Sequence, residues 1–349
     1  MKNDDVLTEW DEKNEEQVDK KSAKKLVWRT RLSISLTVLR TLFIIGFLYL
    51  LYIIPVSVYY DMSGKEAEFN RLVSTLVETH HPGLFVEKFG LENEAEISPL
   101  LTESTSLTLY RNVGDWEVVI GEVTANKRLF GKVNYTFHFD DKYLYDNNYT
   151  FSYAVAPDLL GESFIHDESE PDSSVKSQLE KIEDGFVAQA HFSTKESMDP
   201  EELREMLADY DVKIYQMPVF GGETTAVDVG KGKAGQFTFV PSLMLSPFTE
   251  YNDKNGPRAS YESLTSESAL NDAVDQFYKD IDWLIEHGNY SGRDIDEKRL
   301  EYLKGEGIQV YGAMVTGPIR EIERLQEEEL FHQFYIGGIE VWNWNENKQ

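Results

Sequence analysis

The most nucleotide-like motif in the chain is Gly230-Lys-Gly-Lys-Ala-Gly235, which has the G-x-G-x-x-G spacing of a dinucleotide-binding loop. That chemistry needs a helix directly after the loop, because the helix N-terminus must face the pyrophosphate. Here the loop is followed by Gln-Phe-Thr-Phe-Val, whose β-branched and aromatic residues predict a strand. We therefore interpret the motif as a Gly- and Lys-rich turn, and we predict no cofactor.

Three further groups could do chemistry but lack the partners that it needs. Ser173 and Lys176 have the S-x-x-K spacing of penicillin-interactive enzymes, but no S-D-N or K-T-G motif accompanies them. The acidic run Asp167–Asp172 lacks the glycine and the bidentate glutamate of a calcium loop. His80 and His81 stand at a predicted helix end without further spaced ligands, which favours capping over zinc binding.

The 349-residue chain contains no cysteine, which excludes disulfides, thiolate metal sites and a cysteine nucleophile. Exported eukaryotic domains usually carry disulfides, so their absence favours a bacterial source. The H-E-x-x-H and G-x-S-x-G motifs of zinc proteases and serine hydrolases are also absent from the sequence. We therefore predict that the protein is not an enzyme and has no metal site.

An uncharged apolar segment of 20 residues runs from Thr41 to Tyr60. As a helix it would be about 30 Å long, which matches the hydrocarbon thickness of a bilayer. It is too long and too far from the N-terminus for a cleaved signal peptide, and it lacks the polar face of a core helix. We predict a permanent anchor over residues 38–60. The predicted anchor residues are Thr41, Leu42, Phe43, Ile44, Ile45, Phe47, Leu48, Leu50, Leu51, Ile53, Ile54 and Pro55.

Basic residues on one side of the anchor predict its orientation. Because positively charged flanks stay in the cytoplasm, residues 1–37 are predicted to lie inside the plasma membrane and residues from 61 onward outside it. Residues 1–60 hold nine Lys or Arg and eight Asp or Glu, which leaves 25 basic and 54 acidic residues outside, a net charge of about −29. Such a surface repels nucleic acid, and no nucleic-acid partner is predicted. The topogenic residues are Lys20, Lys21, Lys24, Lys25, Arg29, Arg31 and Arg40.

The first element predicted outside the membrane is a helix. Apolar residues within Phe69–Val77 recur at helical spacing, and His80 and His81 precede a Pro-Gly pair that ends the pattern. Ser63 and Glu66 have the spacing of a capping box at its start. We expect residues 64–80 to couple the anchor to the exterior.

The remaining pattern predicts an α+β ectodomain. Residues within Val133–Asp140 alternate between apolar and polar, as in an antiparallel β segment. Two strand–helix–strand units follow, at Gly185–Phe220 and Gly307–Trp342, and the first helix has Asp199 as its N-cap. An amphipathic helix, Leu270–Leu284, lies between the units. Two such units predict a ferredoxin-like α/β sheet with a helical insertion.

The predicted fold class is a single-pass membrane protein whose membrane-proximal antiparallel β domain is followed by the α/β domain. The predicted organisation is a cytoplasmic acidic and basic tail (1–37), a transmembrane helix (38–60), a membrane-proximal helix plus β domain (61–160), a linker (161–184), the C-terminal α/β regulator domain (185–343) and a short tail (344–349).

Four stretches and this layout resemble a known family. They are KSAKKLVWRTRLSISLTVLRTLF, AQAHFSTKESMDPEELREML, VYGAMVTGPIREIERL and YIGGIEV. Across roughly residues 20–343 the chain resembles the bacterial membrane-anchored sigma-factor regulators. The resemblance implies an anti-sigma factor whose inner tail holds an extracytoplasmic-function sigma factor while its outer domains report the state of the envelope. The expected contacts within Glu9–Arg31 are Trp10, Val18, Leu26 and Trp28.

Alternatives to this interpretation remain. Because the apolar residues of the tail form no single stripe, a second membrane protein is an alternative partner. A surface-anchored binding or scaffold protein without a transcriptional role is the second candidate function, and an anchored envelope hydrolase is the third, although no motif favours it. No small-molecule substrate is evident.

Overall fold

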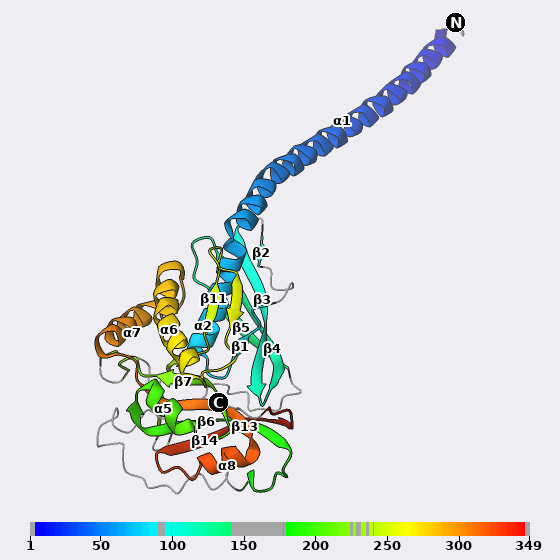
Figure 1. Cartoon of the computed structure of the whole chain (residues 1–349). Helices are drawn as coiled ribbons and strands as arrows, with labels where there is room; N and C mark the ends of the chain where they lie inside the picture. Colours follow the sequence, from blue (N-terminus) through cyan, green and yellow to red (C-terminus); the bar gives the residue numbers. More distant parts are fainter. Residues whose placement is uncertain are drawn as a thin grey trace. The chain divides into compact units, whose positions relative to one another are not determined.

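The structure is a computed structural model of the whole chain (Figure 1). The chain divides into two compact units, Met1–Met62 and Ser63–Gln349, and each is described by itself. Ser173, Lys176, the acidic run Asp167–Asp172 and most of the predicted linker lie outside the described residues. The structure describes residues 4–89, 95–98, 100–140, 177, 179–223, 226–227, 232–234, 237–239 and 241–345.

The first unit is a helix, α1 (Asp4–Ser63), which contains the predicted anchor and continues beyond it in both directions. Pro55 lies within the helix, close to its C-terminal end. The hydroxyls of Thr37 and Thr41 donate hydrogen bonds to the carbonyls four residues earlier, at 2.8 and 2.9 Å. This bonding satisfies the hydroxyls where lipid could not do so.

The second unit opens with α2 (Lys65–His80), and the predicted apolar stripe is confirmed because each of its residues is at most 2% exposed. Polar residues on its other faces, including Ser74 and Glu78, are buried as well. The helix ends at His80, as predicted, because His81 adopts extended backbone. The expected capping box of Ser63 and Glu66 stays a prediction: Ser63 is the last residue of α1, and the residue at the N-cap of α2 is Gly64.

An antiparallel sheet follows α2, with strand order β1-β3-β4-β5 and with β2 paired to β3. In β5 the predicted alternation is confirmed: Tyr135, Phe137 and Phe139 pack against the core, while the residues between them are exposed. The bounds are β1 (Phe85–Val86), β2 (Glu96–Ile97), β3 (Thr102–Val113), β4 (Trp116–Arg128) and β5 (Asn134–Phe139).

A second antiparallel sheet has the order β10-β7-β13-β6-β14. The two predicted strand–helix–strand units interleave in it, because β13 of the second unit lies between β6 and β7 of the first. Nearly every residue of β7 and β13 is buried, as expected of central strands covered on both faces. The bounds are β6 (Phe186–Met198), β7 (Lys213–Val219), β10 (Leu243–Leu245), β13 (Val310–Pro318) and β14 (Phe331–Val341).

The helices of these units are α5 (Pro200–Leu207) and α8 (Ile319–Leu325). The predicted N-cap of α5 is confirmed, since the Asp199 carboxylate accepts a hydrogen bond from the Glu201 amide at 2.8 Å. The acidic residues in the first turn of α5 add a favourable interaction with the helix dipole.

The insertion between β7 and β13 carries short hairpins and two helices. The Gly-rich motif contains β8 and is followed by a strand, β9, rather than by the helix that a dinucleotide site would need. The bounds are β8 (Gly232–Ala234), β9 (Phe237–Phe239), β11 (Thr249–Tyr251), β12 (Pro257–Ser260), α6 (Glu267–His287) and α7 (Arg293–Glu306).

The two sheets meet where β3 and the following turn contact β14. The Arg111 guanidinium donates to the Gly337 carbonyl at 2.7 Å, and the Trp116 indole N–H donates to the Val341 carbonyl at 3.0 Å. A Cβ atom at Gly337 would lie 2.4 Å from Gln189 Oε1. Gln189 belongs to β6 of the same sheet, whereas a Cβ atom at Gly338 would lie 3.0 Å from Val113 of β3. Glycine at 338 therefore permits the close approach of the two sheets, which belong to one unit. Whether residues 61–160 and 185–343 fold as separate domains stays a prediction.

Two histidines, His191 which is buried and His81 which is half-buried, make the stability of this unit dependent on pH. Burial, together with neighbouring His80, lowers the pKa of His81 to about 4, and burial together with Arg111 lowers the pKa of His191 to about 3. Both rings are therefore neutral in the folded unit at pH 5, whereas an unfolded chain protonates its histidines near pH 6.5. The unfolded state binds more protons below pH 6.5, so stability falls as the pH falls.

We expect the thermal unfolding temperature of the protein to drop between pH 7 and pH 4.5, and the drop to be smaller in His191→Phe. Phenylalanine keeps a ring against Tyr335, on which His191 stacks at 5.0 Å between centroids, and removes the titrating group. The matched control is His138→Phe, on the exposed face of β5. An unfolding temperature of His191→Phe that tracks the parent over this pH range would contradict the assignment.

Candidate functional site: the N-terminal helix and the helix that follows it

The predicted partner contacts lie on α1. Leu26 is 69% exposed and Trp28 is 66% exposed, while Trp10 and Val18 fall in the part of the helix whose side chains are not described. Leu26 and Trp28 stand two positions apart, so they project from different sides of the helix, and each is an exposed apolar side chain of the kind that partner proteins bury. Within the first unit, no other part of the chain covers Leu26 or Trp28, so both side chains can contact a partner.

The predicted anchor and topogenic residues also lie on the surface of α1. Each predicted anchor residue is exposed within the unit except Ile53, which is half-buried, and all of the predicted topogenic residues are exposed. Within the described residues, one helix is long and apolar enough to cross a membrane, and its candidate span is Lys20–Tyr60. An apolar surface of this length without protein cover is compatible with lipid contact.

The break between α1 and α2 is a single residue, Gly64, with a φ of 70°. An added Cβ atom would lie 2.9 Å from the Lys254 carbonyl oxygen, so glycine is required both by the left-handed backbone and by space. Lys254 belongs to the loop between β11 and β12. The start of α2 is therefore fixed against the insertion of the second unit.

Gly64→Ala is expected to lower the free energy of unfolding of the second unit by roughly 1–3 kcal/mol, because alanine is strained at this φ and meets Lys254. The matched control is Gly305→Ala in α7, where an added Cβ atom meets nothing within 4 Å. That change should stabilise the unit by about 0.5–1 kcal/mol. Thermal unfolding of both variants measures the difference, and equal unfolding temperatures would contradict this account of Gly64.

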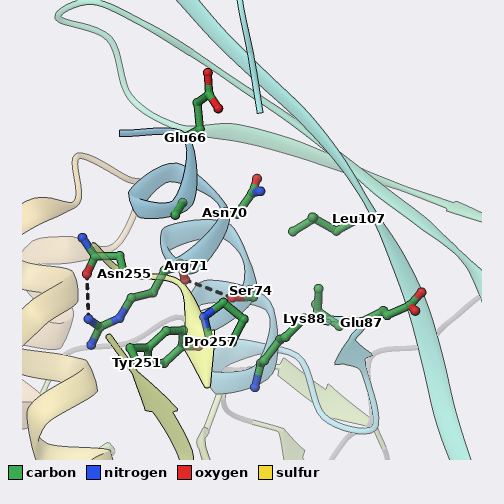
Figure 2. A pocket seen from close by; sticks show the side chains of 12 residues that line it. Glu66, Asn70, Arg71, Ser74, Glu87, Lys88, Leu107, Tyr251, Asn255 and Pro257 are labelled. Carbon is green, nitrogen blue, oxygen red and sulfur yellow. Dashed lines mark hydrogen bonds between the residues drawn. The ribbon is translucent and has the colours of Figure 1, made fainter. Parts of the chain in front are cut away.

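Arg71 links the middle of α2 to the insertion. Figure 2 shows it reaching from α2 towards Tyr251 and Asn255, beside a pocket of about 220 Å³. Its guanidinium lies 4.2 Å from the Tyr251 ring centroid and 4.1 Å from that of Trp283, so it is held between two aromatic faces. Its nitrogens also donate to Asn255 Oδ1 at 2.9 Å and to Asp280 Oδ1 at 3.3 Å.

Glu78 links the last turn of α2 to β1 and β11. The Lys88 ammonium lies 2.6 Å from Glu78 Oε2 and donates to Thr249 Oγ1 at 2.9 Å. Burial alone would lower the pKa of Lys88, but the Glu78 charge outweighs it and the pKa is raised. The other Glu78 oxygen accepts the Val86 amide at 3.0 Å. A charged pair with these hydrogen bonds is costly to separate.

His80, the last residue of α2, joins a buried network in α7 and the insertion. His80 Nε2 and the Tyr290 hydroxyl each lie 2.8 Å from Asp296 Oδ2. Arg299 lies 3.3 Å from Asp296 Oδ1 and 2.8 Å from Glu223 Oε1. These three charged residues are at most 3% exposed. The network therefore ties the end of α2 to two more segments.

The two carboxylates of this network differ in their response to burial. Burial raises the pKa of Glu223 in spite of Arg299. Burial would also raise the pKa of Asp296, but the hydrogen bonds from His80 and Tyr290 and the charge of Arg299 hold it below its ordinary value. Asp296 is therefore a stable anion that keeps His80 and Arg299 in place.

These contacts make α2 a rigid element rather than a reactive site. In Figure 1, α2 lies between α6 and strand β3, and it contacts α6, β1, β3 and β10. Among the described residues, no group of three or more His, Asp or Glu side chains could hold a metal ion. The contacts of Arg71, Glu78 and His80 hold α2 at several points along its length. A displacement of either sheet can therefore be passed on to α2.

Sequence reasoning missed the side chains that hold α2. Asp296, Arg299, Leu300 and Leu303 recur at the spacing of one helix face, and all four are buried. A pair of charged residues on an otherwise apolar stripe was the available signal. Arg71 gave no comparable signal, because its aromatic and acidic partners lie about 180 to 210 positions later in the chain.

Comparison with known proteins bears on both units. Residues 179–337 match the family model described as sigma factor regulator C-terminal. The chain is 23% identical over 302 residues to the probable anti-sigma-M factor YhdL of Bacillus subtilis (strain 168), and the match covers 82% of this chain and 74% of that protein. No solved structure matches.

Proposed function

We propose that this chain, whose residues 179–337 match the sigma factor regulator C-terminal model, is a membrane-anchored anti-sigma factor that couples an envelope cue to transcription. The anti-sigma function is supported by the family match and by the similarity to an anti-sigma factor along most of the chain. The proposed mechanism rests on the connection between the two helices. Only Gly64 separates the end of α1 from the start of α2, and α2 is held inside the second unit.

In this mechanism residues 1–37 lie in the cytoplasm and the second unit lies outside. The orientation is supported by the seven basic residues between Lys20 and Arg40 and by the lack of acidic residues in that segment. The inner segment Glu9–Arg31 holds an extracytoplasmic-function sigma factor through Trp10, Val18, Leu26 and Trp28. A second membrane protein is a further proposed partner, because these four residues form a small apolar contact.

The outer unit acts as the sensor. A cue that favours one arrangement of the two sheets changes the position of α2, and α2 passes the change to α1 across Gly64. We also class the second sheet as ferredoxin-like, because its four long strands have the order β7-β13-β6-β14 with antiparallel neighbours, and a helix follows β6 and β13.

Deletion of residues 4–31 tests the proposal in the cell. A reporter driven by the promoter of the regulated sigma factor should become constitutively active, because the anchor and outer unit can no longer restrain that factor. The control is the same chain with residues 4–31 in a shuffled order, which keeps length and charge. An unchanged transcription profile after the deletion would instead favour a surface-anchored binding protein without a transcriptional role.

A further inference from the structure

A cleft of about 610 Å³ lies between the two sheets of the outer unit, within the volume range of ligand sites. Its lining comes from β1 and β3 of the first sheet, from β7 of the second, and from the segment after β12. Glu78 of α2 also lines it. A ligand in this cleft would therefore touch both sheets and the helix that follows the anchor.

The floor of the cleft is aromatic. The Phe85 ring stacks on Tyr110 at 5.7 Å between centroids and meets Tyr215 edge to face at 6.0 Å. Phe85 and Tyr215 are 4% and 5% exposed. Rings from β1, β3 and β7 thus form one surface on which a planar or apolar group can pack.

Two buried polar groups on this floor have no partner within the described part of the chain. The Asn112 side chain is 7% exposed and the Tyr215 side chain is 5% exposed, and both line the cleft. Among the described residues, neither the Asn112 amide nor the Tyr215 hydroxyl has a hydrogen-bond partner. Both side chains line the cleft, so a ligand bound there can offer each of them a hydrogen-bond donor or acceptor.

The charges of the cleft are predominantly negative. Its two cations are already paired, Lys88 with Glu78 and Lys213 with Asp115. Glu117 and Glu262 stand exposed at the rim, and neither forms an ion pair with a described residue. They come from β4 and from the segment after β12, so they approach a ligand from two sides. A ligand that satisfies this rim carries positive charge.

We propose that the cleft between the two sheets is a binding site for a short cationic peptide. Basic side chains of the peptide pair with Glu117 and Glu262, an apolar side chain packs on the Phe85–Tyr110–Tyr215 surface, and a peptide group bonds Asn112 and Tyr215. A peptide supplies all three features in one molecule, because its backbone carries an N–H and a C=O and its side chains can be basic and apolar. The inference deepens the proposed function, because it names the class of ligand that the outer unit senses.

The test is titration of the full-length protein in detergent with a synthetic peptide of alternating arginine and tryptophan. Binding is expected, and the same peptide with neutral citrulline in place of arginine should bind at least tenfold more weakly. Glu117→Gln combined with Glu262→Gln should weaken binding about tenfold at low salt, and raising the salt concentration should reduce that difference. The matched control is Glu286→Gln, an exposed acid on α6 outside the cleft.

Tyr215→Phe separates recognition from folding. It removes a hydroxyl without a hydrogen-bond partner, so the unfolding temperature should stay the same or rise, while peptide affinity should fall roughly three- to tenfold. Absence of binding, equal binding of the citrulline peptide or of the polyamine spermine, or unchanged affinity of the variants would overturn the proposal. The titration contains no sigma factor, so its failure would leave the proposed anti-sigma function standing.

Discussion

The Trp28→Ala variant is expected to bind its sigma factor at least about 30-fold more weakly than the parent chain. An indole that is 66% exposed loses a large contact area when it is truncated, and central tryptophans of interfaces commonly contribute 2 kcal/mol or more. Trp28 precedes the predicted anchor at residue 38 by ten residues, about 15 Å of helix. Since a headgroup layer is only roughly 5–8 Å thick, the indole is within reach of a cytoplasmic partner.

The measurement is a titration of labelled sigma factor with the full-length protein in detergent. Leu42→Ala is the matched control, because Leu42 is 60% exposed on the same helix but lies in the predicted anchor. It should leave the dissociation constant unchanged. If Trp28→Ala and Leu42→Ala bind the sigma factor equally well, Trp28 is not a partner contact and the inner contact lies elsewhere within Glu9–Arg31.

Arg299→Ala should lower the stability of the second unit, Ser63–Gln349, by about 3–5 kcal/mol. Arg299 is 3% exposed and pairs with Glu223 and Asp296, which are both 1% exposed. Removal of the guanidinium leaves two buried carboxylates without their cation, and that uncompensated charge rather than the lost contact dominates the cost. The unfolding temperature should fall by on the order of 10 °C.

Arg293→Ala on the same helix is the control for this effect. Arg293 forms an i,i+4 pair with Glu297 in which both side chains are 43% or more exposed, and such pairs contribute at most about 0.5 kcal/mol. Calorimetry measures the unfolding temperatures of the two variants. It thereby compares the loss of a buried arginine with the loss of an exposed arginine from the same helix. Similar unfolding temperatures for both would contradict the role assigned to the buried network around His80.

The local elements were predictable because their determinants lie close together in the sequence. Asp199 and Pro200 mark the start of α5, and the predicted N-cap hydrogen bond is present. The strands within Gly185–Phe220 and Gly307–Trp342 follow from apolar runs bounded by turn residues. The resemblance to sigma-factor regulators was likewise based on short stretches, and it is confirmed by the family match over residues 179–337.

The contacts that position α2 were not predictable, because their partners are distant in sequence. His80 meets Asp296, 216 positions later, and Arg111 meets Gly337, 226 positions later. Nothing in a single sequence specifies which buried charge finds which partner. The steric need for glycine at the break between α1 and α2 was not predictable for a related reason, because the fit of Gly64 depends on Lys254, 190 positions later in the chain.

The most direct test of the account is retention of a sigma factor by the purified full-length protein. The protein is isolated in detergent from cells that express it with their own extracytoplasmic-function sigma factors, and the bound proteins are identified by mass spectrometry. The account predicts that one such factor co-purifies with the full chain and is lost when residues 4–31 are deleted. No retained sigma factor at low salt, or equal retention after the deletion, would contradict it.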